Sequence, residues 1–473
     1  MRRNHGAETR LGRRDFLRMA AAGAGIAAAG PAAGLTAKAE GGRKNVLFLI
    51  SDDLNTDIGC YGHPIVQTPN LDALARRGVR FHHAYCQFSV CNPSRASFLT
   101  GLRPETLGVV NNKDNFRDLN PDVVSLPQFF REQGYYTATI GKTFHVGEKD
   151  PKSWDFAAEW WLDELRSTKG PFDNPTRNHE HQLGWCLWKE VTEGDTYDDS
   201  ILRHTLDQLD VCAQKEEPFF LACGFIRPHN PYFAPQRFFE PYPVEKLRLP
   251  EEPADADDPP AGAFPIGQWG QAYEQLTTVE KKELLRAYYA CISYVDDSVG
   301  QVLDRLRELG LEEDTIVVFL GDHGYHCWEK DWWGKTTVFE RSARSPLMIA
   351  YPGMPTAGRT CHRVVEFLDL YPTLARMAGF ERPEGLEGRN LVPLLREPTM
   401  AWDEWSGAAY TQFGRNLWSV RTERWRYCEW TGREGGRALY DHKNDPEEHH
   451  NVVDHPEYAE TVERLETMLA AKR

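Results

Sequence analysis

Four short, continuous apolar runs constrain the fold of this chain most. They lie at residues 45–51, 218–224, 315–320 and 346–350. Runs of this length and composition are typical of strands in a parallel sheet that is covered on both faces. Helical patterns separate the runs, at residues 70–77, 125–133 and 279–309. Strands that alternate with helices predict an α/β domain with a doubly wound, mostly parallel sheet sandwiched by helices.

The character of the chain changes near residue 401. Residues 417–427 and 437–440 have the pattern of antiparallel strands, and a helical pattern follows at 458–471. The run Glu447-Glu-His-His450 between them is interpreted as an exposed face. We therefore expect a main α/β domain at 40–400 and a smaller C-terminal α+β subdomain, with a small antiparallel sheet, at 401–473.

The first 39 residues are expected to be a targeting signal rather than part of the folded domain. Arg13 and Arg14 precede a weakly apolar stretch at 19–35, and Ala37-Lys-Ala39 offers a cleavage site. This pattern is typical of a twin-arginine (Tat) export signal, and it predicts a periplasmic or secreted protein. A basic amphipathic start to the domain is the alternative, but a stretch rich in glycine and alanine would make a poor helix there.

The charge balance limits the partners of the chain. Its 473 residues include 55 Lys and Arg against 70 Asp and Glu, a net charge of -15. Binding to nucleic acid through a broad electrostatic surface is therefore not expected. No run of about 20 apolar residues follows residue 40, so no membrane span is expected either. If the ligand is an anion, the positive charge must be gathered in one pocket.

Acidic residues follow two of the apolar runs. Asp52 and Asp53 come after the first run, and Asp322 and His323 come after the third. In doubly wound folds, ligands bind beyond the carboxyl ends of the strands. Carboxylates brought together there repel one another unless a cation lies between them, and oxygen ligands favour a hard divalent ion, Ca²⁺ before Mg²⁺. Helix capping is the alternative role of each acidic group taken alone.

A possible nucleophile lies between these two groups. Cys91-Asn-Pro-Ser-Arg95 is followed by Ala-Ser-Phe-Leu-Thr100-Gly101. A free cysteine is commonly a buried structural thiol. At a helix N-terminus, however, Arg95 and the free backbone N–H groups would form an anion cradle. A nucleophile at position 91 would then face the metal and the anion together.

Cys-x-Pro-Ser-Arg followed by Thr-Gly resembles the signature of the type I sulfatases. The resemblance continues over nearly all of the chain, from about residue 45 to about residue 451. The further matching motifs are Gly141–His145, Arg227–His229, Gly321–Gly324, Lys335 and Leu439–Pro446. The resemblance implies an alkaline-phosphatase-like fold and a sulfuric ester hydrolase.

The finer resemblance is to the iduronate-2-sulfatase branch. Two residues separate Lys142 from His145, where many arylsulfatases have Lys-x-His, and His323 follows Asp322 where many sulfatases have asparagine. Two further segments are similar to that branch, Arg227–Pro231 and Ser419–Thr422. This resemblance implies a sulfated carbohydrate substrate, such as a 2-O-sulfated uronic acid or a related polysaccharide fragment.

The resemblance also implies a role for each matching residue. In the family a formylglycine-generating enzyme oxidises the cysteine, here Cys91, to formylglycine, whose hydrate supplies the nucleophilic oxygen. The implied calcium ligands are Asp52, Asp53, Asp322, His323 and the modified Cys91. The implied stabilisers of the sulfuryl group are Arg95, Lys142 and Lys335. His229 is expected to protonate the leaving sugar oxygen, and His145 to help deprotonate the second hydroxyl.

Other features of the site stay open at this point. Arg421 is a candidate fourth cation of the pocket, and Tyr325 and His326 are candidates for substrate selection. Some relatives with the same Cys-x-Pro-Ser-Arg motif hydrolyse phosphonate or phosphate esters, so that activity is an alternative function. A catalytically inactive carbohydrate-binding protein is another alternative, and it would bind glycans without releasing sulfate.

Overall fold

The computed structural model describes residues 43–147, 150–158, 188–194, 196–257, 262–264, 276–432 and 435–473. The export signal predicted at 1–39 lies outside these residues. Residues 43–473 form one compact unit, and the division expected at residue 400 stays a prediction. Among the described residues, none of the helices combines the length and the apolar character that crossing a membrane requires.

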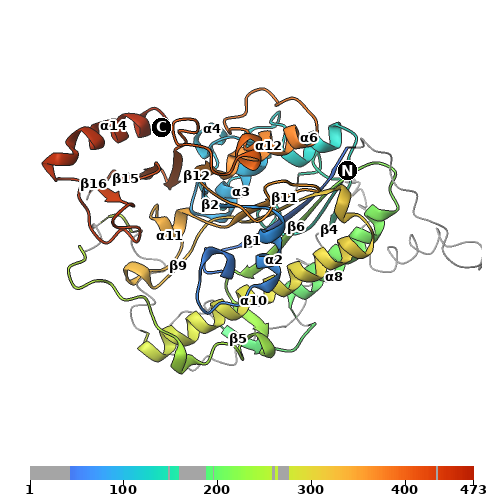
Figure 1. Ribbon diagram of the computed structural model, residues 1–473, viewed down its shortest axis with the longest axis horizontal. Helices are drawn as coiled ribbons and strands as arrows, with labels where there is room; N and C mark the ends of the chain where they lie inside the picture. Colours follow the sequence, from blue (N-terminus) through green and yellow to red (C-terminus); the bar gives the residue numbers. More distant parts are fainter. Residues whose placement is uncertain are drawn as a thin grey trace, which may run out of the picture. The chain divides into compact units, whose positions relative to one another are not determined.

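An eight-stranded sheet runs through the compact unit (Figure 1). Its strand order is β12-β2-β11-β8-β1-β6-β3-β4. The bounds are β1 Asn45–Asp52, β2 Val79–Tyr85, β3 Tyr136–Gly141, β4 Phe156–Ala158, β6 Phe219–Pro228, β8 Thr315–Gly321, β11 Leu347–Ala350 and β12 Thr360–Glu366. All of these strands except β11 run in one direction, so the prediction of a mostly parallel sheet is confirmed.

Strand β11 corrects one expectation. The run at 346–350 was grouped with the parallel strands, but β11 pairs antiparallel with both β8 and β2. A continuous apolar run reports burial on both faces and carries no information on direction. Between β8 and β11 there is no long crossover helix, so the chain re-enters the sheet at the edge where it left and runs the opposite way.

Helices cover both faces of the sheet, as Figure 1 shows. Alternate residues of β1 face opposite cores, with Leu47 and Leu49 on one side and Phe48 and Ile50 on the other. The first core includes α2 Pro69–Arg77, α8 Tyr197–Ala213 and α10 Thr278–Glu308. The second core includes α3 Cys91–Thr100, α6 Leu126–Glu132 and α12 Leu370–Met377. The sandwiched α/β architecture predicted from the sequence is confirmed.

Capping residues explain where two of the predicted helices begin. The Ser125 hydroxyl accepts the backbone N–H of Gln128 at the start of α6. Thr277 and Glu280 form a reciprocal capping box at the start of α10. Before residue 400, the described residues also form α4 Pro104–Leu107, α5 Phe116–Leu119, β5 Trp188–Val191, β7 Tyr232–Pro235, β9 His326–Cys327, β10 Trp333–Gly334, α11 Glu340–Ala343 and α13 Val392–Arg396.

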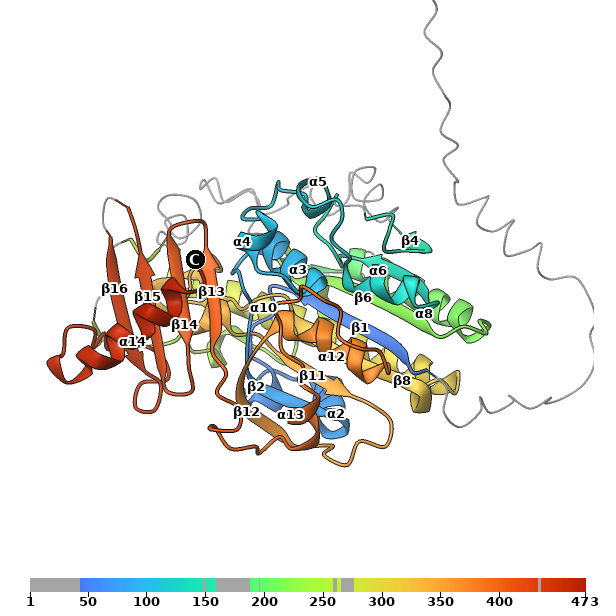
Figure 2. The same cartoon turned by 90° about the horizontal axis from the view of Figure 1, so that it is seen from above.

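A smaller antiparallel sheet follows near the C-terminus, at one end of the compact unit (Figure 2). Its strands and covering helix are β13 Ala409–Phe413, β14 Leu417–Arg421, β15 Trp425–Trp430, β16 Gly436–Asp441 and α14 Ala459–Ala470. Buried Arg426 of β15 joins this sheet to α11, because its guanidinium contacts the Glu340 carboxylate at 2.5 Å and the Glu448 carboxylate at 2.6 Å. Glu448 is buried and both histidines are half-buried, so the expectation of an exposed face holds for Glu447 and is wrong for Glu448.

Gly224 of β6 permits the close approach of the segment that carries Lys142. The Gly224 carbonyl accepts the Lys142 N–H at 2.7 Å, and a Cβ at position 224 would lie 2.0 Å from the Lys142 carbonyl oxygen.

We expect Gly224→Ala to lower the free energy of unfolding by about 1–3 kcal/mol, because the backbone at Lys142 must move. Urea unfolding measures this. Gly435→Ala is the control, since its nearest neighbour would be 3.4 Å away, and equal losses in both variants would contradict the argument.

Candidate active site

The carboxyl ends of three neighbouring strands gather the polar residues singled out in the sequence. Asp52 ends β1, His229 follows β6, and Asp322 follows β8. The N-terminus of α3 brings Cys91 to the same place, where its thiol lies 3.4 Å from His323 Nε2. The predicted meeting of the two acidic groups at one edge of the sheet is confirmed.

The Asp53 backbone adopts the left-handed conformation, with φ of 62°, so the chain turns sharply after β1. The Asp53 N–H donates to Asp322 Oδ1 at 3.0 Å, and the Tyr288 hydroxyl donates to the Asp53 carbonyl at 2.7 Å. The Asp53 carboxylate bonds Lys335 and lies 3.4 Å from His323 Nε2. These contacts aim two adjacent carboxylates, Asp52 and Asp53, into one buried site.

Cys91 is the first residue of α3, and the residue before it makes no side-chain cap. Lys335 Nζ lies 2.9 Å from its Sγ. Burial and the Asp52 carboxylate raise the pKa of the Cys91 thiol, but Lys142 and Lys335 outweigh them and hold this pKa well below its usual range. Residue 91 thus lies where the surroundings stabilise negative charge.

Arg95 is one turn further along α3 and is completely buried. Its Nε donates to Asp322 Oδ2 at 2.9 Å, and its Nη2 lies 3.4 Å from Asp52 Oδ1. Its Nη1 donates to the Thr143 carbonyl at 3.2 Å. One guanidinium therefore joins the ends of β1 and β8 with the loop that follows β3.

Two lysines complete the positive side of the cluster. Lys142 donates to Asp52, and Lys335 donates to Asp53. Burial lowers the pKa of each ammonium group, but neighbouring carboxylates, Asp52 for Lys142 and Asp53 for Lys335, raise it above the ordinary value. Both side chains are thus cationic at neutral pH.

The two candidate proton-transfer histidines have opposite electrostatic environments. Burial lowers the pKa of His229, but Asp53 and Asp52 outweigh it and raise this pKa above the usual value. Its Nδ1 donates to the Asn230 carbonyl at 2.6 Å, so its Nε2 faces Asp53 Oδ2 at 4.0 Å. Burial, followed by Lys142 and Arg95, lowers the pKa of His145 to about 2. The protonated form is therefore favoured more strongly at His229 than at His145.

The side chains present fit a divalent cation. One ligand atom from each of Asp52, Cys91, Asp322 and His323 lies within 4.8 Å of the others, and Asp52, Asp53, Cys91 and His229 form an overlapping group. Asp52 Oδ1 is buried and accepts no hydrogen bond from the described residues. His323 Nδ1 bonds the Gly324 carbonyl at 2.9 Å, which leaves Nε2 available as a ligand. Three of the six side chains in these two groups are carboxylates, whose oxygens suit a hard cation.

A cavity of about 180 Å³ opens above the cluster. Asp53, His229 and Lys335 line it together with Tyr325, one of the two residues expected to affect substrate selection. The other, His326, does not line the cavity, because it is fully buried and bonds Thr337 Oγ1 at 2.9 Å. Arg421 does not line it either, since that guanidinium is buried beside Glu340.

The sequence did not indicate the other residues that line this cavity. They are Val90, Asn112, Asn230, Trp333, Gly334 and Thr336. Trp333 and Asn112 belong to segments with no motif of their own, so no signal in a single sequence marks them. Asn230 lies in the segment Arg227–Pro231, which resembles the iduronate-2-sulfatase branch but did not itself indicate a lining residue.

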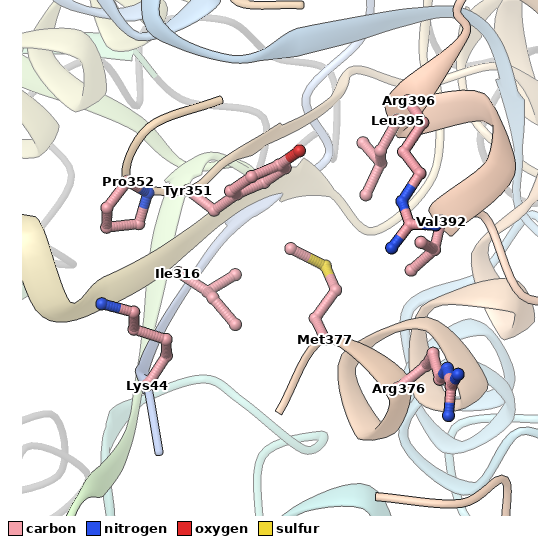
Figure 3. Close-up of a pocket in the computed structure, with 9 residues that line it drawn as sticks. All are labelled: Lys44, Ile316, Tyr351, Pro352, Arg376, Met377, Val392, Leu395 and Arg396. Atoms are coloured by element: carbon pink, nitrogen blue, oxygen red, sulfur yellow. The ribbon is translucent and has the colours of Figure 1, made fainter. Parts of the chain in front are cut away.

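A second cavity, of about 220 Å³, lies at the amino edge of the sheet (Figure 3). Its lining includes Lys44, just before β1, and Ile316, near the start of β8, so it is at the other end of these strands from the acidic cluster. Lys44 is paired with Asp314 at 2.8 Å, and Arg376 with Glu381 at 3.2 Å. No residue predicted for the site lines it.

Comparison with known proteins identifies the family. The family model described as Sulfatase matches residues 44–380. The chain belongs to the sulfatase family. A second model, described as the C-terminal region of N-sulphoglucosamine sulphohydrolase, matches residues 328–473 of this sulfatase. The chain is thus a sulfuric ester hydrolase, as the motifs predicted.

Individual relatives cover nearly the whole length of this sulfatase. A sulfatase of Formosa agariphila is 31% identical over 90% of this chain and 86% of its own. The iduronate 2-sulfatase of Mus musculus is 28% identical over 89% of this chain and 93% of its own. The chain is therefore similar to iduronate 2-sulfatases over most of its length, as the motifs predicted. This similarity does not identify the substrate of the chain.

Solved structures share the fold of this sulfatase. One is an enzyme in complex with its substrate D-glucosamine-2-N,6-O-disulfate, with a TM-score of 0.74, 22% identity, and coverage of 91% of this chain and 97% of the other. The phosphonate monoester hydrolase of Agrobacterium radiobacter has a TM-score of 0.72 and 24% identity, and the match covers 91% of this chain and 95% of the other. At these identities the comparison establishes the fold alone.

Adding Ca²⁺ to the metal-free protein is expected to raise the free energy of unfolding by about 4 kcal/mol when the ion is at about 1,000 times its dissociation constant. The physical reason is that a cation relieves the repulsion among the buried carboxylates. Thermal unfolding and titration calorimetry measure the effect. Asp53→Asn should weaken it, whereas Asp454→Asn, an exposed control, should not. Equal stability with Ca²⁺ and with a chelator would contradict the metal site.

Proposed function

We propose that this sulfatase hydrolyses a sulfate ester of a sulfated carbohydrate, with formylglycine at position 91 as nucleophile and Ca²⁺ as the resident ion. The observation that carries the proposal is the position of Cys91. It lies at the N-terminus of α3, 2.9 Å from Lys335 Nζ and 3.4 Å from His323 Nε2, between carboxylates suited to a metal. Such a position stabilises both an oxyanion at residue 91 and the charge of a bound sulfate.

Formylglycine and the metal supply chemistry that the unmodified chain lacks. The formylglycine hydrate would offer one hydroxyl for attack on sulfur and a second for expelling sulfate, and a bound cation would lower the pKa of a hydroxyl and screen the ester's charge. Asp52, Asp53, Asp322, His323 and residue 91 would hold the ion. Mg²⁺ is the less favoured ion, because it demands a more regular octahedral geometry than this mixed set offers.

The cations of the site bind and stabilise the sulfuryl group. Lys335 pairs with Asp53, Lys142 pairs with Asp52, and Arg95 Nη2 lies 3.4 Å from Asp52 Oδ1. Because all three are held in place by ion pairs before substrate binds, they need no rearrangement as charge develops on the sulfuryl oxygens. The same local cations explain how a protein of net charge -15 takes an anionic substrate.

The two histidines divide the proton transfers. Asp53 and Asp52 raise the pKa of His229, which favours its protonated form, and its Nε2 is the proposed donor to the leaving sugar oxygen. His145 is neutral, and its buried Nδ1 makes no hydrogen bond with the described residues. This Nδ1 is therefore available to accept a hydrogen bond from the second hydroxyl.

The substrate proposed is a 2-O-sulfated uronic acid or a related fragment of a sulfated polysaccharide. The support is the likeness to iduronate 2-sulfatases over most of both chains, together with the spacing of Lys142 and His145. An anionic sugar also suits a cavity lined by Lys335 and His229.

Export and maturation complete the proposal. The twin-arginine pattern at 1–39 supports transport by the Tat machinery to the periplasm or outside the cell, with the sulfatase domain at 40–400 and its C-terminal subdomain at 401–473. Because that machinery moves folded proteins, a formylglycine-generating enzyme would have to act on Cys91 before export.

Hydrolysis of phosphonate or phosphate esters is a second candidate function. The observation in its favour is the shared fold with the phosphonate monoester hydrolase of Agrobacterium radiobacter. Rates on p-nitrophenyl sulfate, p-nitrophenyl phosphate and a matched phosphonate monoester separate the two candidates. We expect the sulfate ester to react fastest, and faster phosphonate or phosphate turnover would favour the second candidate.

Replacing the nucleophile tests the proposed chemistry. Cys91→Ala should lower sulfate release, followed by ion chromatography, by at least about 10³-fold, because no formylglycine can form. Cys60→Ala is a matched control, since that half-buried cysteine lies outside the cluster. Full activity in Cys91→Ala would contradict the mechanism. Tight glycan binding without any sulfate release by the wild type would instead support an inactive carbohydrate-binding protein.

A further inference from the structure

Asn92, which occupies the variable position of the Cys-x-Pro-Ser-Arg motif, holds a loop against the N-terminus of α3. Its side chain is buried, and its Nδ2 donates to the carbonyls of Asn111 at 3.0 Å and Asp114 at 2.6 Å. The loop is also rigid in itself, because Asn111 Oδ1 accepts the backbone N–H groups of Lys113 and Asp114. Asn92 therefore determines where this loop lies relative to residue 91.

Asn112, in the middle of the loop, presents hydrogen-bond donors to the cavity. Its Oδ1 accepts the backbone N–H of Asn92 at 3.2 Å, one of the N–H groups left unpaired at the start of α3. This bond orients the amide, so that Oδ1 faces the helix and Nδ2 faces away from it. No described residue accepts a hydrogen bond from Nδ2, and Asn112 lines the cavity together with His229 and Lys335.

Burial distinguishes the floor of the cavity from its mouth. Asp53 is only 1% exposed, whereas Asn112 is an exposed residue. A sulfate group must reach residue 91 at the floor, beside Lys335. The part of the substrate that lies level with Asn112 is therefore the sugar that carries the sulfate, and the two Nδ2 hydrogens can bond its hydroxyl or carboxylate oxygens.

We propose that Asn112 is a specificity-determining residue that donates to the sugar portion of the substrate, and that Asn92 is the positioning residue that holds it there. This inference rests on the proposed function. It gives a role to Asn92, the residue at the variable position of the Cys-x-Pro-Ser-Arg motif. An oxygen-rich sugar uses the donor, whereas an aryl group in the same place cannot.

Steady-state kinetics of Asn112 variants test the first half of the proposal. The probes are p-nitrophenyl sulfate and a heparin-derived disaccharide with a 2-O-sulfated uronic acid. Asn112→Ala should raise KM for the disaccharide about tenfold, and clearly more than KM for the aryl ester, because one hydrogen bond to the sugar is lost. Asn112→Asp should raise it further, since a carboxylate repels the anionic sugar. Asn416→Asp adds the same charge at an exposed position that does not line the cavity, and it should change neither KM.

A double-mutant cycle tests the second half. Asn92→Ala should raise KM for the disaccharide while leaving kcat nearly the same, and it should add little in an Asn112→Ala background, because Asn92 acts through Asn112. Asn92→Gln, which keeps the amide, should restore part of the lost affinity. Mass spectrometry of the peptide across residue 91 must accompany each variant, so that rates are compared per mole of formylglycine.

The outcomes separate this inference from the proposed function. A wild type that releases sulfate from neither probe contradicts both. An active wild type whose Asn112 variants change KM for the two probes equally, or not at all, overturns the inference alone. An active wild type that neither cleaves the disaccharide nor is inhibited by it also overturns the inference. Additive effects of the Asn92 and Asn112 substitutions would overturn the positioning role.

Discussion

Three carboxylates buried at one edge of a sheet are the constraint on which the rest of this site depends. Asp52, Asp53 and Asp322 would repel one another and lose their hydration, a cost of several kcal/mol for each ion unless it is compensated. Arg95, Lys142 and Lys335 supply three opposing charges from three different segments. Asp52 Oδ1 still makes no hydrogen bond among the described residues, so it is available as a ligand for the proposed cation.

The same compensation explains why the reactive position lies on α3. The residue before Cys91 provides no side-chain cap for α3, and Arg95, one turn later, bonds Asp322. A nucleophile at residue 91 is then held by the ion pairs that hold the metal ligands. One buried network thus includes the proposed nucleophile, the side chains that would hold a metal and the cations that would bind sulfate, and it lies at the ends of strands that are central in the sheet.

Much of this arrangement could be predicted from the sequence. Continuous apolar runs predicted the strands, and the residues directly after them predicted the acidic cluster, because the carboxyl ends of parallel strands share one edge. The direction of β11 could not be predicted, since a buried strand has the same composition in either direction. Glu448 and Arg421 were also misplaced, because their burial depends on ion pairs with Arg426 and Glu340 that are distant in the chain. Asn112 could be found only once Asn92 was seen to hold its loop.

The central claim is that residue 91 acts as formylglycine. Its most direct test is peptide mass spectrometry across this residue, on full-length protein produced together with a formylglycine-generating enzyme. We predict a peptide whose mass corresponds to an aldehyde or its hydrate at position 91 and which reacts with a hydrazide probe. An unmodified thiol at that position, in a protein that nevertheless releases sulfate, would contradict the account.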